Sequence, residues 1–126
     1  MPPSRIIVVD DDDAVRSIIC ALAQEALPDA TICAHTSSVH ALREIEAGAD
    51  LLITNCHMPD VDGPTLVHTI REMKNSIPNL MVSGSEEARR LGEEAGIDKF
   101  VEKSRLNGEL SDAIHTCLSS VGKNLN

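Results

Sequence analysis

The chain of 126 residues fits one compact domain with a modest core, and 42% hydrophobic next to 25% charged residues is a globular balance. Its 20 acidic and 11 basic residues give a formal net charge of −9, which argues against nucleic acid or an anionic membrane as a direct partner, because phosphate groups attract basic surfaces. There is no apolar run of the ~18 residues that a membrane span needs, and no apolar signal-peptide stretch near the N-terminus, so a cytoplasmic protein is expected.

The cysteines do not form a metal-binding or redox motif. Four of them are spread along the chain without a CxxC pair or a Cys/His cluster: Cys20, Cys33, Cys56 and Cys117. We expect small buried thiols, with one disulfide pair as the alternative. Phe100 is the only aromatic residue, so the core must consist of Ile, Leu, Val, Ala and Met.

The first part of the chain alternates between strand and helix. Residues 6–9 are an unbroken β-branched run, typical of a fully buried strand. Residues 14–27 have helical apolar spacing, which Pro28 ends. A second short strand is expected at 30–34, and it is followed by a helix at about 37–47.

The middle of the chain continues this alternation. Ser37 or Ser38 would cap the second helix, and Gly48 would end it. A third strand at 51–54 precedes a helix that opens with Pro64, a residue favoured in the first turn, and runs to about residue 74. Four apolar residues are expected on the inner face of this helix: Leu66, Val67, Ile70 and Met73.

The last part of the chain predicts two more strands and two more helices. A strand at 79–82 leads to a polar helix at 86–95 that Gly96 ends. A fifth strand at 99–102 precedes a final helix at 107–121. Four residues of this helix are expected to be buried: Leu110, Ile114, Cys117 and Leu118.

Five strands alternating with five helices through short loops predict an α/β fold, a parallel sheet with helices on both faces and strand order 2-1-3-4-5. The chain reads as a single domain over residues 1–126, with its core at about 4–120. Open sheets of this kind bind ligands beyond the carboxyl ends of their strands, so the residues at those ends are the candidate site.

Four aspartates, Asp10 to Asp13, follow the first strand. One or two acids suffice to stabilise a helix N-terminus, whereas four repel one another unless a cation is present. Clustered carboxylate oxygens suit Mg²⁺. We therefore predict that Asp10 and Asp11 serve a metal and that Asp12 and Asp13 cap the helix. The same acids disfavour a nucleotide-phosphate cradle.

Polar side chains also end the other strands of the expected sheet. Asn55 ends the third strand, Ser83 before Gly84 ends the fourth, and Lys103 ends the fifth. Each alone has an ordinary explanation, because a lysine is usually solvated and a Ser-Gly pair is usually a turn. Acids, an amide, a hydroxyl and an ammonium group at one sheet edge together indicate a binding site.

Four segments carry a resemblance to a known family: VVDDD at 8–12, D-L-L-I-T-N-x-x-M-P-x-x-x-G at 50–63, VSG at 82–84 and FVEKS at 100–104. Over about residues 4–120 the chain resembles a response-regulator receiver domain, the CheY-like family of two-component signalling. The resemblance implies a flavodoxin-like doubly wound (βα)5 three-layer sandwich and a non-enzymatic signalling role.

The resemblance also implies roles for the residues at the strand ends. Asp10, Asp11 and the backbone carbonyl of His57 would hold Mg²⁺ together with the side chain at position 55. Ser83 and Lys103 would bind a phosphoryl group carried by that side chain.

The chain departs from the family at two positions. Asn55 stands where the family carries the phosphorylated aspartate, and an amide oxygen is too poor a nucleophile to form a stable acyl phosphate. Ser104 stands where the family usually has a proline after a cis peptide, so the Lys103–Ser104 bond is expected to be trans or strained. Mg²⁺ is expected to bind weakly or not at all, with Lys103 or a water filling the gap.

Several explanations of Asn55 remain open. The chain could be a natural phosphorylation-silent receiver, or an ordinary receiver whose aspartate was engineered to Asn55. A third explanation places the phosphorylation elsewhere, on Ser83 or Asp11. A small flavodoxin-like nucleotide-binding protein is a remote alternative, because it would need a phosphate cradle that the sequence lacks.

The resemblance further implies partners. A sensor histidine kinase or phosphotransfer protein and an output protein are expected, with no direct nucleic acid or membrane contact, in a monomer or weak homodimer. The output surface would be formed by the fourth helix, the fifth strand and the last helix, with Leu91, Lys99 and Phe100 as candidates. Phe100 is the aromatic expected to change rotamer with activation.

Overall fold

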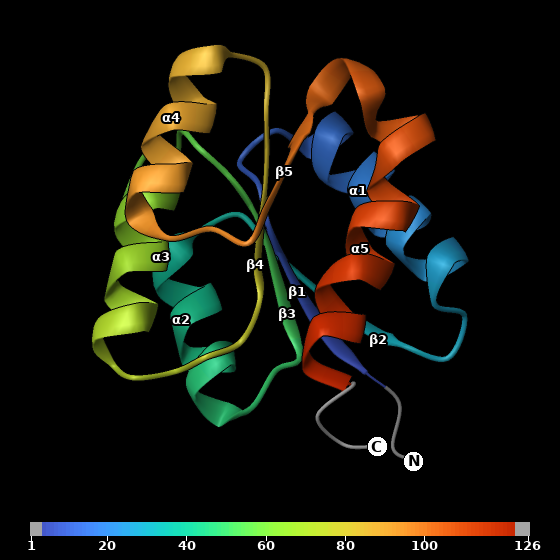
Figure 1. Cartoon of the computed structure of the whole chain (residues 1–126), viewed down its shortest axis with the longest axis horizontal. Coiled ribbons are helices and arrows are strands. Elements are labelled where there is room, and N and C mark those ends of the chain that lie inside the picture. The colour runs from blue at the N-terminus through green and yellow to red at the C-terminus, as the bar shows by residue number, and fades with distance from the viewer. Residues whose placement is uncertain (1–3, 123–126) are drawn as a thin grey trace.

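The computed structural model describes residues 4–122, which form a five-stranded sheet between two layers of helices (Figure 1). The strands are β1 (Arg5–Val9), β2 (Thr31–His35), β3 (Leu51–Asn55), β4 (Asn79–Ser83) and β5 (Lys99–Glu102). The helices are α1 (Asp13–Ala26), α2 (Ser38–Ala47), α3 (Gly63–Glu72), α4 (Glu86–Ala95) and α5 (Leu106–Gly122), with a single 3₁₀ turn, η1 (Lys103–Arg105), before α5.

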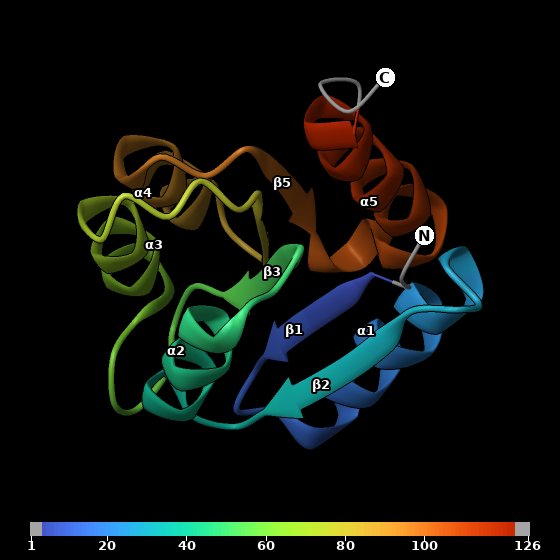
Figure 2. The ribbon, with the colours of Figure 1, turned by 90° about the horizontal axis from the view of Figure 1, so that it is seen from below.

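The sheet has the predicted topology. Its strands lie in the order β2-β1-β3-β4-β5, and each neighbouring pair is parallel. Figure 2 shows α1 and α5 covering one face of the sheet, while α2, α3 and α4 cover the other. The predicted flavodoxin-like (βα)5 sandwich is therefore the observed architecture.

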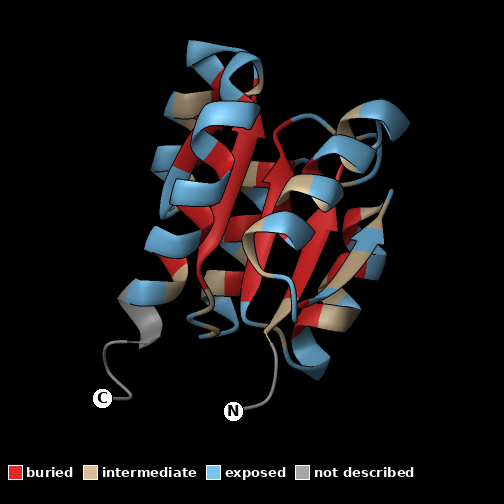
Figure 3. Cartoon of the chain, turned by 90° about the vertical axis from the view of Figure 1, so that its right-hand side faces the viewer, coloured by how far each residue is buried: buried red, intermediate tan, exposed pale blue. Residues whose placement is uncertain are grey.

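The core forms two layers because successive strand residues point to opposite faces of the sheet. In β1, Ile6 and Val8 pack toward α1 and α5, whereas Ile7 and Val9 pack toward α2 and α3. All four are 0% exposed. Figure 3 shows the buried strands at the centre of the molecule and exposed residues on the outer faces of the helices. The two apolar layers hold the strand ends, and with them the candidate site, in fixed positions.

Several helix boundaries are set by the predicted residues. Asp12 caps α1, because its side chain accepts a hydrogen bond from the backbone N–H of Val15 at 3.0 Å. Gly48 and Gly96 end α2 and α4 with φ of 121° and 101°, values that only glycine adopts at little cost. The prediction that Ser37 or Ser38 caps α2 is wrong, since Ser37 is the N-cap residue but its side chain forms no capping hydrogen bond, and the hydroxyl of Ser38 donates to the Val61 carbonyl instead.

Two apolar residues are less buried than predicted. Met73 was expected on the inner face of α3, but the helix ends at Glu72 and the side chain of Met73 is 41% exposed at the C-cap. The chain turns away there, with Lys74 at a φ of 60°. Leu118 in α5 is only half-buried, although Leu110, Ile114 and Cys117 are buried as predicted.

Three further features of residues 4–122 bear on the sequence analysis. The four cysteines are free thiols, so the disulfide alternative is wrong; Cys56 and Cys117 are buried as predicted, but Cys20 and Cys33 are only half-buried. Every peptide bond in this part of the chain is trans, including Lys103–Ser104. No helix in this range is long and apolar enough to cross a membrane.

Candidate functional site

The parallel strands bring the predicted site residues to one edge of the sheet. In the strand register Val9 lies beside Thr54, Asn55 beside Val82, and Ser83 beside Glu102. Because the carboxyl ends of these strands are level, the residues at or just after those ends converge there: Asp10, Asp11, Asn55, Ser83 and Lys103. The side chains of Asp11 and Asn55 are in direct contact, with Oδ1 of the acid 3.4 Å from Nδ2 of the amide.

Asp10 is the buried acid of this edge, with 0% of its surface exposed. Its Oδ1 accepts the backbone N–H of Asp12 at 2.9 Å, while its buried Oδ2 has no hydrogen-bond partner among the residues that the structure describes. Burial raises the pKa of Asp10, and the Asp12 N–H and the charge of Lys103 partly offset this shift. An acceptor that lacks a partner in such a place is free to take a donor or a cation.

Asn55 is also buried, with 5% exposure, and both ends of its amide are engaged. Nδ2 donates to the carbonyl of His57 at 2.8 Å and to Asp11 at 3.4 Å, whereas Oδ1 accepts the backbone N–H of Cys56 at 2.8 Å. A backbone N–H can only donate and a carbonyl can only accept, so the orientation of the amide follows from its neighbours. The nitrogen therefore faces the acidic side of the site.

The loop after β3 is held close to Asn55. The N–H of Gly63 donates to the carbonyl of Cys56 at 2.7 Å, and a Cβ at position 63 would lie 2.1 Å from the Asn55 carbonyl oxygen. Asp62 caps α3 through the N–H of Thr65 at 2.8 Å. Only glycine permits this approach of α3 to the end of β3.

Asp60, in the same loop, has a role that the sequence did not indicate. Its carboxylate accepts hydrogen bonds from the Ser37 hydroxyl and from the N–H groups of Ser38 and Val39, at the start of α2. These contacts lower the pKa of Asp60 below its ordinary 3.8, the Ser37 hydroxyl being the largest cause. No local signal could reveal this contact, because Asp60 and Ser37 lie 23 residues apart in the chain.

Ser83 and Lys103 complete the site from the other side. Ser83 is buried at the end of β4, and Lys103 is half-buried at the start of η1. Lys103 forms no ion pair within residues 4–122, although its charge acts on Asp10. The site thus combines the Lys103 ammonium group with Asp10, whose Oδ2 has no hydrogen-bond partner among the described residues.

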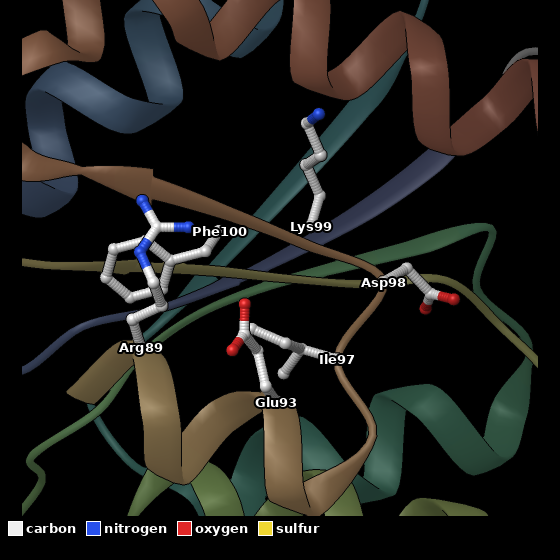
Figure 4. A pocket seen from close by; sticks show the side chains of 6 residues that line it. All are labelled: Arg89, Glu93, Ile97, Asp98, Lys99 and Phe100. Carbon is white, nitrogen blue, oxygen red and sulfur yellow. The ribbon is translucent and has the colours of Figure 1, made fainter. Parts of the chain in front are cut away.

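Phe100, on β5, packs against the chain next to the site. Its ring is buried, with 8% exposure, and packs with Cys56, Met81 and Ala88. The guanidinium carbon of Arg89 lies 4.4 Å from the ring centroid, so Arg89 covers the ring from α4. Both side chains line a groove between α4 and β5 (Figure 4), whose volume is about 220 Å³. Cys56, which belongs to the same cluster as Phe100, donates its backbone N–H to the Asn55 amide and so connects the ring to the site.

The donor atoms do not match a magnesium site in this arrangement. Mg²⁺ takes oxygen ligands, and Asp10, Asp11 and the His57 carbonyl could supply them. Asn55, however, turns its nitrogen and hydrogens toward Asp11 and His57. Within the part of the chain that the structure describes, no group of three His, Cys, Asp or Glu side chains is placed to hold a metal ion.

Curated proteins share sequence with this chain. Transcriptional regulatory protein PrrA of Mycobacterium tuberculosis (strain ATCC 25618 / H37Rv) is 31% identical over 122 residues, which are 94% of this chain and 51% of PrrA. Two-component response regulator ORR21 of Oryza sativa subsp. indica is 34% identical over 80 residues, 63% of this chain and 11% of ORR21. The chain thus spans about half of one relative and a small part of the other.

Solved structures share the fold. A response regulator from Chloroflexus aurantiacus J-10-fl superposes with a TM-score of 0.85 at 28% identity, over 93% of this chain and 98% of that one. The chemotaxis protein CheY4 of Vibrio cholerae has a TM-score of 0.80 at 21% identity, over 92% and 99% of the two chains. Residues 6–115 match the response regulator receiver domain family. Together with the five-stranded sheet and the residues at its carboxyl edge, this match shows that the chain belongs to the response regulator receiver domain family.

Proposed function

We propose that this chain is a receiver domain of two-component signalling that, with Asn55 in its sequence, accepts no phosphoryl group and acts as a protein-interaction module. The observation that carries the proposal is Asn55, which ends β3 beside Asp11 in a buried position with both ends of its amide hydrogen-bonded. In this proposal Asn55 occupies the phosphoacceptor position of the family.

The chemistry of the amide supports the silence of this position. Attack on a phosphoryl donor requires an anionic carboxylate oxygen, and the amide oxygen is neutral. The Asn55 Oδ1 is also occupied by the N–H of Cys56 at 2.8 Å, which reduces its availability further. In this proposal Ser83, at the end of β4, and Lys103, at the start of η1, would bind a phosphoryl group, but the site has no nucleophile to receive it.

The remaining site roles follow the same proposal. Asp10, Asp11 and the carbonyl of His57 are the oxygen ligands that a carboxylate at position 55 would complete. With the amide there, Mg²⁺ binds weakly or not at all. Asn55 is thus the residue that decides both the phosphoryl chemistry and the metal affinity of the site.

The partners proposed for the chain are proteins. A sensor histidine kinase or phosphotransfer protein would dock on it, and an output protein would read it, in the cytoplasm. The proposed output surface is formed by α4, β5 and α5. On this surface Lys99 is exposed, Leu91 is half-buried, and Phe100 is buried beneath Arg89. An output protein would therefore meet Lys99 and Arg89 before it reached the Phe100 ring.

The test is incubation with acetyl phosphate and Mg²⁺, followed by intact mass. The unaltered chain should gain no phosphoryl group, whereas Asn55→Asp should gain one. The mass before incubation serves as a control, because hydrolysis of the Asn55 amide would create the acceptor. Phosphorylation of the unaltered chain, at Ser83, Asp11 or any other residue, would contradict the proposal.

A further inference from the structure

We infer that the Asn55 amide takes the place of a cation at the carboxyl edge of the sheet, because its Nδ2 group links the His57 carbonyl to the Asp11 carboxylate. The acidic edge of the sheet is then held together without a divalent metal. The inference deepens the proposed function, on which it rests, and assigns Asn55 as a positioning residue for the loop after β3.

The contacts of Nδ2 carry the first step. The group has two hydrogens and two acceptors, the His57 carbonyl at 2.8 Å and Asp11 Oδ1 at 3.4 Å. These are oxygens of the kind that Mg²⁺ binds at about 2.0–2.1 Å. The first distance is an ordinary N–H···O hydrogen bond, whereas the second is longer than the usual range of about 2.7–3.2 Å and acts mainly through charge. The Nδ2 group therefore contacts two oxygens that Mg²⁺ could bind, but it lies farther from each of them than a bound Mg²⁺ would.

The contacts of Oδ1 prevent the amide from reversing. If the amide were flipped, Nδ2 would face the Cys56 N–H, and two donors would meet at a separation of 2.8 Å. Oδ1 would then face the His57 carbonyl and the Asp11 carboxylate, so that three acceptors would meet. Because Asn55 is only 5% exposed, water could not relieve these contacts. The reversed orientation, in which Oδ1 would face a metal ion bound by Asp11 and the His57 carbonyl, therefore has a higher free energy than the observed one.

A carboxylate at position 55 would reverse this situation. It would have the same shape but no hydrogens to donate, and it would add a third negative charge to those of Asp10 and Asp11. Like charges at such distances disfavour one another unless a cation is present. The buried Oδ2 of Asp10, which has no partner among the described residues, belongs to the same carboxyl edge of the sheet as this added charge. The stability of such a variant should depend on Mg²⁺, and that of the unaltered chain should not.

The experiment measures the melting temperature of the full chain in EDTA and in roughly 10 mM MgCl₂ at matched ionic strength, since a ligand stabilises only the state that binds it. The unaltered chain should melt at the same temperature in both buffers. Asn55→Asp should melt lower in EDTA and gain roughly 3–6 °C with Mg²⁺. Asn107→Asp, which adds the same charge at an exposed position of α5, is the matched control and should show no Mg²⁺ response.

A second variant tests the link itself. Asn55→Ala removes the amide without adding a charge, and it should melt below the unaltered chain in EDTA without recovering in Mg²⁺. The inference would be overturned if the unaltered chain gained as much from Mg²⁺ as Asn55→Asp. It would also be overturned if Asn55→Ala melted at the same temperature as the unaltered chain. A chain that stays unphosphorylated but is stabilised by Mg²⁺ would contradict this inference and the weak Mg²⁺ binding proposed above, and would leave the proposed phosphorylation-silent function standing.

Discussion

The hydroxyl of Ser37 donates a hydrogen bond of 2.7 Å to Oδ2 of Asp60, across 23 residues of sequence. The same carboxylate accepts the N–H of Val39 at 3.2 Å and that of Ser38 at 3.4 Å. The hydroxyl of Ser38 in turn donates to the carbonyl of Val61 at 2.7 Å. The loop that follows Asn55 therefore caps α2 and is anchored by it, because the first N–H groups of a helix need acceptors from outside.

Asp60→Ala tests this long-range cap. Loss of the acceptor should lower the free energy of unfolding by about 1 kcal/mol at neutral pH, as for other helix caps. The pKa of Asp60 is lowered from 3.8 in the folded protein. Its stabilisation is therefore present above the unfolded pKa and is lost as the pH falls below 3.8. The exposure of Asp60 keeps the charge component small.

Urea unfolding at about pH 7 and about pH 3 measures this effect, and the difference between Asp60→Ala and the unaltered chain should shrink at the lower pH. Asp29→Ala, an exposed acid in the turn after α1, is the control and should change little. An equal loss for Asp60→Ala at both pH values would show that its charge does not contribute.

Gly63→Ala tests the close approach of α3 to the end of β3. The added Cβ would lie 2.1 Å from the Asn55 carbonyl oxygen and 3.2 Å from the Cys56 Cα, both of which are backbone atoms that cannot move aside. We expect a loss of at least about 3 kcal/mol in the free energy of unfolding.

Gly108→Ala is the matched control for that substitution. Nothing lies within 4 Å of a Cβ at position 108 in α5, so alanine should stabilise the helix by up to about 1 kcal/mol. Denaturant unfolding of both variants decides, and similar stabilities would mean that the loop moves freely away from β3.

Magnesium titration tests the charge balance at the carboxyl edge of the sheet. Asn55→Asp should bind Mg²⁺ about tenfold more tightly than the unaltered chain, because a charge then replaces a dipole next to the ion. Adding Lys103→Ala to that variant should tighten binding further, because the charge that acts on Asp10 is removed. Calorimetry measures both effects. Equal Mg²⁺ affinity of the unaltered chain and Asn55→Asp would show that the residue does not face the metal.

Arg89→Ala tests what keeps the Phe100 ring buried. The guanidinium lies 4.4 Å from the ring centroid, and such a contact contributes about 0.5–1 kcal/mol at a partly exposed site. The variant should lose about that much stability, and NMR cross-peaks between the ring and Met81, its neighbour in the same cluster, should weaken. Arg90→Ala on the exposed side of α4 is the control. Unchanged cross-peaks in Arg89→Ala would show that packing alone fixes the rotamer.

Much of the fold was determined by local patterns in the sequence. The β-branched run of β1 is buried whatever its neighbours are, because it has no polar side to expose. Gly48 and Gly96 end their helices because their backbone angles suit no other residue well. Asp12 caps α1 through an atom three residues away. Such features depend on neighbours in the chain, and for this reason they could be predicted from it.

The tertiary structure alone decided which partners the polar residues find. The sequence placed Asn55 at the carboxyl edge of the sheet beside Asp11, but its amide could have presented either oxygen or nitrogen there. The orientation follows from the Cys56 N–H and the His57 carbonyl, whose directions are set by the turn after β3. Likewise the sequence predicted that Ser37 or Ser38 would cap α2, whereas Asp60 provides the cap from another loop. Met73 had an apolar side chain in helical spacing, but the helix ended one residue before it. Sequence periodicity specifies which face is buried, whereas hydrogen-bond direction and helix ends depend on atoms that only folding brings together.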